Sequence, residues 1–189
     1  MASIERPAVS DALRLARSKF LAPERLDMSA LADELAINRV TLYRWVGSRD
    51  RLMLEVAWSL THDALTEIRA ETEGHGGERI VAIITRLLER ITSNPGMRRW
   101  LTDESEHAMR LLTRHDTEFQ PRLTAAIHGL LQEEAATGAL NVPVDLHELA
   151  YLIVRMIEFY AYLPLITGEL PNPDRAQPIL RMLLRQPWP

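Results

Sequence analysis

The stretch from residue 29 to residue 53, SALADELAINRVTLYRWVGSRDRLM, constrains the fold most, because its pattern predicts two short helices joined by a tight turn. Leu31 and Leu35 stand four residues apart and give the first helix one apolar stripe. Ser29 precedes that stripe and is a residue type that caps helix N-termini, so we expect the first helix to begin there. Asn38 is expected to cap the second helix in the same way.

The second helix is predicted to turn one face inward and to leave a donor-rich face outside. Its inward positions stand at i, i+3 and i+4: Leu42, Trp45 and Val46. The other side chains carry hydrogen-bond donors: Arg39, Thr41, Tyr43 and Arg44. Guanidinium groups pair with guanine edges or phosphates, and hydroxyls reach phosphates or base edges, so this face predicts a helix that reads the major groove of DNA.

An ordinary helical hairpin is the alternative, because most charged helix faces are only solvated. The upstream context favours the DNA-reading interpretation, since residues 10–20 predict a further helix. Its apolar positions could cover the inner face of the hairpin: Leu13, Leu15, Ala16, Phe20 and Leu21. We therefore expect a three-helix unit.

The segment NRVTLYRWVGSRDRLMLEV resembles the N-terminal signature of the TetR family of one-component transcriptional regulators, and the likeness spans about residues 10–60. The resemblance implies that Leu42 and Val46 anchor the second helix and that Arg49 holds a DNA phosphate. The DNA-facing residues that it implies are Ser29, Arg39, Val40, Thr41, Tyr43, Arg44 and Trp45. The chain departs from the pattern at Ala36, where many members have glycine, so this turn must avoid positive φ or tolerate strain.

Composition excludes several classes of protein. With 189 residues and 47% hydrophobic content, the chain can bury a core of one or two small domains. No uninterrupted apolar run approaches the roughly 18 residues that span a bilayer, and the first residues lack the apolar region of a secretory signal. Cysteine is absent, which excludes disulfides and thiolate metal sites. We expect a cytoplasmic protein with no membrane partner.

The net charge of −4 is unevenly distributed. Residues 1–60 hold nine Arg or Lys against eight Asp or Glu, whereas residues 61–189 hold thirteen against eighteen. Between Arg39 and Arg51 there are four arginines and one aspartate, so positive charge concentrates on the predicted reading surface.

Helical periodicity continues to the C-terminus, and no segment alternates with period two, so we predict an all-α fold. Ser48 is expected to cap a long helix over residues 49–70, and the glycines of residues 71–77 to form a flexible joint. Further helices are predicted over residues 78–92, 97–114, 119–137 and 146–167, with a last one starting near residue 174 or at Pro178. The domains expected are a DNA-binding unit (1–48), a connecting helix and hinge (49–77), and an effector-binding and dimerisation domain (78–189).

No catalytic constellation, metal site or cofactor is predicted. Gly74 and His75 begin a glycine-rich stretch like an esterase oxyanion loop, but no Gly-x-Ser-x-Gly elbow accompanies it, so a hinge is the better interpretation. Asp103, Glu106 and His107 share neighbouring turns, but no second ligand cluster accompanies them.

One C-terminal helix carries an unusual polar stripe. Tyr151, Arg155, Glu158 and Tyr162 recur at spacings of four, three and four, and the ionic pair is either a ligand contact or a structural salt bridge. The region after Arg155 resembles the QsdR subgroup of the TetR family. We expect an effector cavity for a largely apolar small molecule, lined by Trp100, His107, Phe119, Leu123, Ile127, Tyr151, Arg155, Glu158, Phe159 and Tyr162.

The last two helices offer more apolar faces than one domain covers, which predicts a homodimer. Its expected residues are Leu149, Leu152, Ile153, Met156 and Ile157, with Ile179, Leu180, Leu183 and Leu184. The function expected is that of a ligand-responsive transcriptional regulator, with repression as the expected mode. It would bind palindromic double-stranded operator DNA, and the effector would release it from that DNA. The alternative is a helical binding protein or enzyme with no DNA role.

Overall fold

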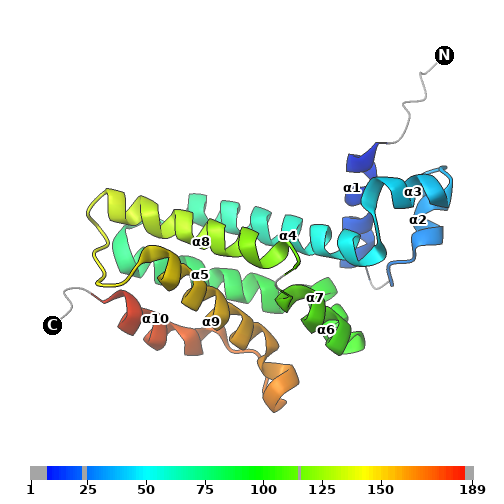
Figure 1. Cartoon of the computed structure of the whole chain (residues 1–189). Helices are drawn as coiled ribbons and strands as arrows, with labels where there is room; N and C mark the ends of the chain where they lie inside the picture. Colours follow the sequence, from blue (N-terminus) through cyan, green and yellow to red (C-terminus); the bar gives the residue numbers. More distant parts are fainter. Residues whose placement is uncertain (1–7, 23–24, 115, 186–189) are drawn as a thin grey trace.

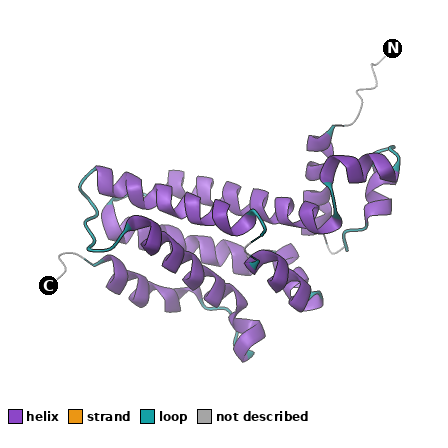
Figure 2. Ribbon diagram, viewed as in Figure 1, coloured by secondary structure: helices purple, strands orange, loops and turns teal. Residues whose placement is uncertain are grey.

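The computed structural model describes residues 8–22, 25–114 and 116–185, and the regular elements among them are all helices. α1 (Val9–Leu21), α2 (Met28–Glu34) and α3 (Arg39–Val46) form a small unit at one end of the molecule (Figure 1, Figure 2). α4 (Arg49–Glu71) leaves this unit and runs along the bundle formed by the other helices (Figure 1). This arrangement confirms the predicted all-α fold with an N-terminal helix-turn-helix unit.

The bundle contains the remaining elements: α5 (Gly76–Ser93), α6 (Pro95–Asp103), α7 (Ser105–Thr113), α8 (Phe119–Ala136), α9 (Leu146–Thr167), η1 (Pro173–Ala176) and α10 (Gln177–Leu184). The predicted apolar stripe of α5 lies in the core, where Ile80, Ile83 and Leu87 are fully buried. α9 is long and apolar enough to cross a membrane by length and composition alone, but 56% of its most apolar window is buried in the bundle. That burial is typical of a core helix. The domain boundaries at residues 48 and 77 stay a prediction.

Side-chain caps set the starts of the N-terminal helices. Asn38 accepts a hydrogen bond from the Val40 N–H at 2.8 Å, and Ser48 accepts one from the Arg51 N–H at 3.1 Å, which confirms both predicted caps. The cap predicted at Ser29 is wrong. α2 begins at Met28, and the Asp27 carboxylate accepts from the backbone N–H groups at 29 and 30, both at 2.8 Å. The Asp27 carboxylate also carries a full negative charge, which interacts favourably with the positive helix end.

The turn between α2 and α3 stores strain at Ala36, whose φ is 51°. This left-handed conformation costs a non-glycine residue on the order of 1 kcal/mol. Two backbone hydrogen bonds hold it, from Ala36 N–H to Asp33 C=O and from Ile37 N–H to Ala32 C=O, both at 3.0 Å. The turn therefore tolerates strain instead of avoiding positive φ.

The helix predicted over residues 97–114 is two helices, broken at Glu104. Glu104 has φ −128° and ψ 40°, which ends α6 and lets α7 start in a new direction. The local sequence contains no glycine or proline here, and the Glu104 carboxylate pairs with Arg49 of α4. Pro178 lies in the first turn of α10, where its missing N–H leaves no hydrogen bond unmade.

The break predicted at residues 71–77 is confirmed, but two of its glycines are tightly packed. The Gly76 N–H donates to the Glu134 carboxylate at 2.6 Å, and a Cβ at Gly76 would lie 2.4 Å from the Ala139 carbonyl oxygen. A Cβ at Gly77 would lie 2.7 Å from the Leu184 carbonyl oxygen, whereas Gly74 has open space around it. Gly76 and Gly77 therefore serve close packing against neighbouring segments.

Candidate nucleic-acid interface and effector region

α3 turns an apolar face inward and a polar face outward. Leu42 and Val46 are buried, and both anchor the helix as expected. Val40 is 75% exposed, and Arg39 and Arg44 are also exposed. The half-buried residues of the same helix are Thr41, Tyr43 and Trp45. The exposed residues could contact a groove without any change in packing.

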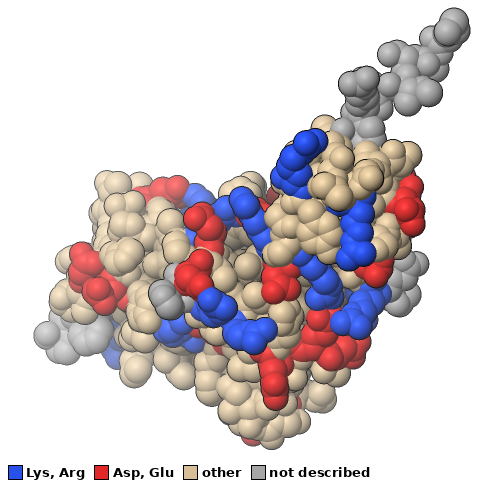
Figure 3. All heavy atoms as spheres, turned by 45° about the vertical axis from the view of Figure 1, so that its right-hand side comes forward, with Lys and Arg blue, Asp and Glu red and all other residues tan. Residues whose placement is uncertain are grey.

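Arg39 and Tyr43 form a local pair on the outer side of α3. The guanidinium of Arg39 donates to the Tyr43 hydroxyl at 3.3 Å and lies 5.4 Å from the ring centroid. This cation–π contact holds the two side chains together in the free protein. Figure 3 shows Lys and Arg side chains on the α1–α3 end of the molecule, and basic and acidic side chains side by side where this end meets the bundle.

Arg49 is paired within the chain, and its contact with a DNA phosphate stays a prediction. Its two terminal nitrogens donate to the Glu104 carboxylate at 2.7 and 2.9 Å, and its Nε donates to the Leu26 carbonyl oxygen at 3.1 Å. The side-chain hydrogen bond from Arg49 lowers the pKa of Glu104, so the carboxylate stays charged. Ser29, the other outlying residue of the predicted set, is exposed in the first turn of α2.

The next residue of α4 is also held by the bundle. His107 Nε2 lies 2.8 Å from an Asp50 carboxylate oxygen, and Arg110 donates to His107 Nδ1 at 2.8 Å. With Nδ1 accepting, Nε2 carries the proton and donates to Asp50. His107 therefore fastens the start of α4 to α7 and does not face the predicted effector cavity. Among the described residues no three metal-ligating side chains cluster.

α6 packs against the end of α1 at the junction between the three-helix unit and the bundle. A Cβ at Gly96 would lie 2.2 Å from the Phe20 carbonyl oxygen, and Arg99 donates to that oxygen at 2.7 Å. The rings of Phe20 and Trp100 meet edge to face with centroids 6.0 Å apart. Trp100, predicted to line an effector cavity with α9 residues, lies instead at this junction because Phe20 of α1 covers it.

The polar stripe of α9 forms a buried network with α8. Arg155 lies 2.8 Å from the Glu158 carboxylate, and both side chains bond to Gln120. Gln120 also donates to the Leu112 carbonyl oxygen at the end of α7, at 2.6 Å. Burial raises the pKa of Glu158, and burial likewise raises the pKa of the Tyr162 hydroxyl.

The ten predicted effector residues are only partly brought together. Arg155 pairs with Glu158, lies 5.0 Å from the ring centroid of Tyr151 and is close to Tyr162. Leu123 and Ile127 are buried in the core. Tyr151 and Phe159 are half exposed, and Phe119 packs edge to face on Trp58 of α4, with centroids 6.3 Å apart. Spacing along one helix put the residues on one stripe, but it could not show which faces the neighbouring helices leave open.

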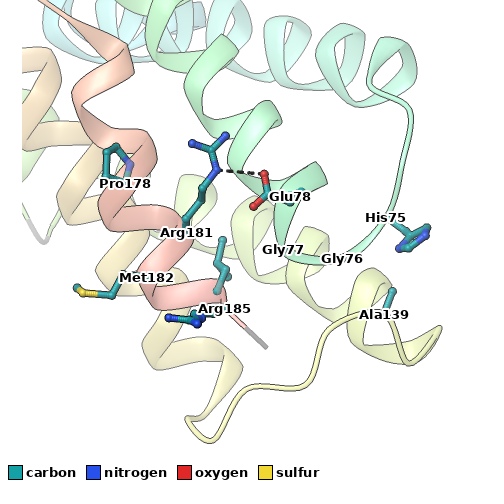
Figure 4. A pocket seen from close by; sticks show the side chains of 10 residues that line it. His75, Gly76, Gly77, Glu78, Ala139, Pro178, Arg181, Met182 and Arg185 are labelled. Carbon is teal, nitrogen blue, oxygen red and sulfur yellow. Dashed lines mark hydrogen bonds and ion pairs between the residues drawn. The ribbon is translucent and has the colours of Figure 1, made fainter. Parts of the chain in front are cut away.

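Three cavities each include at most one of these ten residues. One of about 560 Å³ lies between α4, α7 and α8, over Trp58 and Phe119. One of about 400 Å³ lies at the junction, between α1, α4 and α6, and is named the junction cavity below. A third, of about 610 Å³, lies at the far end of the bundle, where Arg181 reaches Glu78 at 3.1 Å beside Gly76 and Ala139 (Figure 4).

The outer face of α9 and α10 is apolar. Leu152, Phe159 and Ile166 are exposed and lie seven residues apart, which places them on one face of α9. Ile179 and Met182 of α10 are exposed as well. Five of the nine predicted dimer residues lie inside the chain's own core instead: Leu149, Ile153, Ile157, Leu180 and Leu184. Of the predicted set, Leu152 and Ile179 are exposed, and the dimer itself stays a prediction.

This architecture is similar to that of known proteins. The family model described as "Tetracyclin repressor-like, C-terminal domain" matches residues 75–185, more than half of the chain. No curated protein sequence matches significantly. Among solved structures, the transcriptional repressor QsdR of R. erythropolis, from the TetR family, has 28% identity and a TM-score of 0.84, over 93% of both chains.

Two more distant structures share the fold alone. The transcriptional regulator FadR of Bacillus subtilis, in complex with stearoyl-CoA, has 10% identity and a TM-score of 0.61, over 92% of this chain and 96% of that one. The superantigen PfiT has 20% identity and a TM-score of 0.52, over 94% of both chains. The family match covers the regulatory half, the QsdR match covers both halves, and the chain therefore belongs to the TetR family of transcriptional regulators.

Proposed function

We propose that this protein is a homodimeric, cytoplasmic repressor that binds palindromic operator DNA through α3 and is released by a small effector bound in its helical bundle. The observation that carries the proposal is the outer face of α3, where Arg39, Val40 and Arg44 are exposed while Leu42 and Val46 anchor the helix. A major-groove helix needs this division between anchor and donors. Family membership favours a regulatory role over the enzymatic alternative.

The apolar face of α9 and α10 supports the homodimer. A second copy of the chain would cover Leu152, Phe159, Ile166 and Met182, because an isologous interface pairs one patch with itself. The two recognition helices would then be related by a two-fold axis, as a palindrome requires.

The junction contacts support a route from effector to DNA. Arg49 and Asp50 begin α4 directly after α3 and its cap, and both are held by residues of the α6–α7 region. A ligand that moves α6 or α7 would therefore move the start of α4, and with it the separation of the two recognition helices.

Gel shifts with the duplex upstream of the protein's own gene test DNA recognition. We expect Arg39→Ala and Arg44→Ala to weaken specific binding about tenfold or more, because a lost bidentate base contact costs 1–3 kcal/mol. Arg181→Ala is the matched control, since Arg181 lies at the far end of the bundle and should leave the affinity unchanged. Equal affinity of all three variants and the wild type would refute the proposed reading face.

Sedimentation tests the dimer with a pair of residues of equal exposure. Phe159 on α9 and Val144 in the loop before α9 are both 49% exposed. We expect Phe159→Glu to give a monomer, because a buried unpaired charge disfavours the interface, and Val144→Glu to remain a dimer. A wild-type monomer that still binds DNA would contradict the proposed assembly.

A further inference from the structure

The junction cavity combines apolar and cationic walls between three helices. Phe20 of α1 and Trp100 of α6 supply aromatic surface, and Arg25, Arg49 and Arg99 surround the polar part. Two carboxylates, Asp103 and Glu104, also line it, so the side chains carry one net positive charge. Its volume of about 400 Å³ lies in the range of small-molecule sites, which occur preferentially where domains meet.

A buried donor in the cavity wall lacks a partner. Trp100 is 3% exposed, and its indole Nε1 has no hydrogen-bond acceptor among the described residues. An unpaired buried N–H costs folding free energy, and nearly all such groups in native proteins are satisfied. The Nε1 atom is closed off from the cavity as the ring stands, so a ligand acceptor would reach it only after the indole ring turned.

Glu104 occupies the position that an external anion would take. Both of its carboxylate oxygens accept from Arg49, and Arg25 approaches the same group at 3.5 Å. The Arg25 side chain is 79% exposed, so it can turn toward a ligand at little cost. Bidentate binding by arginine suits any carboxylate, whether it belongs to Glu104 or to a ligand.

We propose that the junction cavity binds a small organic carboxylate with an apolar body, and that this ligand competes with Glu104 for Arg49. The apolar body would lie on Phe20 and Trp100, and the carboxylate would accept from the arginines. Binding would release Glu104 from α4, because one guanidinium cannot hold two carboxylates in the same bidentate geometry. This site lies outside the bundle region in which the effector is expected, and its occupancy does not depend on DNA recognition.

The indole N–H signals of the four tryptophans report binding by NMR, with the Trp100 signal assigned from Trp100→Phe. We expect phenylacetate to shift the Trp100 signal to saturation and to leave the signals of Trp45 and Trp58 in place. Phenylacetamide is the matched neutral probe and should shift none of them. Equal shifts with both probes, or no shift with phenylacetate, would overturn the proposal.

Three variants of the full chain test the competition. Glu104→Gln should tighten phenylacetate binding several-fold, because it removes the internal competitor but keeps the side-chain volume. Arg25→Gln, at an exposed position that does not threaten folding, should weaken binding about tenfold if the arginine pairs with the ligand. Arg181→Gln should change nothing. Weaker binding by Glu104→Gln would show that Glu104 supports the site instead of competing for it, and would also overturn the proposal.

Discussion

The junction and the interior of the bundle use the same kind of ion pair, but the pKa of the carboxylate shifts in opposite directions in the two places. At the junction, Arg49 lowers the pKa of Glu104, so the charged carboxylate is favoured. In the bundle, burial raises the pKa of Glu158 even though Arg155 lies 2.8 Å away. Both pairs are partly buried, with side-chain exposures of 23% and 19% for Arg49 and Glu104 and of 34% and 10% for Arg155 and Glu158, so the difference lies in the carboxylates. Glu104 can leave its arginine at a lower desolvation cost than the more deeply buried Glu158, which makes the junction the more adjustable of the two regions.

The two regions also differ in how closely the backbone is packed around their glycines. Gly96 of α6 allows the backbone of α1 to approach so closely that a Cβ would meet the Phe20 carbonyl oxygen at 2.2 Å. Gly129 of α8, in the bundle, has no atom within 4 Å of the position that a Cβ would take. The junction thus combines adjustable charges with a rigid backbone contact.

The largest expected effect comes from Gly96→Ala. Its methyl group would collide with backbone and with the Phe20 ring, so α6 and α1 must separate, which should cost about 3 kcal/mol of unfolding free energy. Gly129→Ala is the control in the bundle and should stabilise the protein by about 0.5–1 kcal/mol, since alanine favours the helix. Urea unfolding measures both. If both substitutions changed the free energy of unfolding in the same direction, the close approach of α1 and α6 would be contradicted.

Arg155→Met should cause the second-largest loss of stability. It leaves the buried Glu158 and Gln120 without their cation, and because Arg155 is 34% exposed we expect a loss of about 2 kcal/mol, below the range for fully buried pairs. Arg181→Met removes an exposed pair with Glu78 and should change thermal stability little. An unchanged melting temperature for Arg155→Met, together with a lost effector response, would make the pair a ligand contact instead of a structural one.

The N-terminal unit could be predicted from local pattern because its determinants are local. The caps at Asn38 and Ser48, and the anchors Leu42 and Val46, follow from spacing within one or two helical turns. The cap predicted at Ser29 was wrong because α2 begins one residue before it, at Met28, where Asp27 is a cap of equal quality.

The regulatory half resisted prediction because its determinants are distant in sequence. Glu104, at the break, pairs with Arg49, which is 55 residues earlier in the chain, and Trp100 packs on Phe20 of another helix. Periodicity gives the inward stripe of α9, but which outward residues stay exposed depends on where α8 and α10 pack. A pattern within one helix contains no information on contacts between distant residues or on the packing of neighbouring helices.

The smallest expected effect is the pH dependence of the junction pair. The Arg49 hydrogen bond lowers the pKa of Glu104 below its ordinary value of 4.5, so the folded protein binds fewer protons at this group than the unfolded chain does. The stabilisation is thus complete above that ordinary value and is lost as pH falls through the lowered pKa. At pH 7 the free energy of unfolding of the wild type should exceed that of Glu104→Gln by about 1 kcal/mol. This difference should vanish in acid, and urea unfolding at several pH values measures it. Glu118→Gln removes an 81% exposed partner of Arg122 and is the control. A wild-type advantage that grew on acidification would contradict the assignment of Glu104 as the charged partner of Arg49.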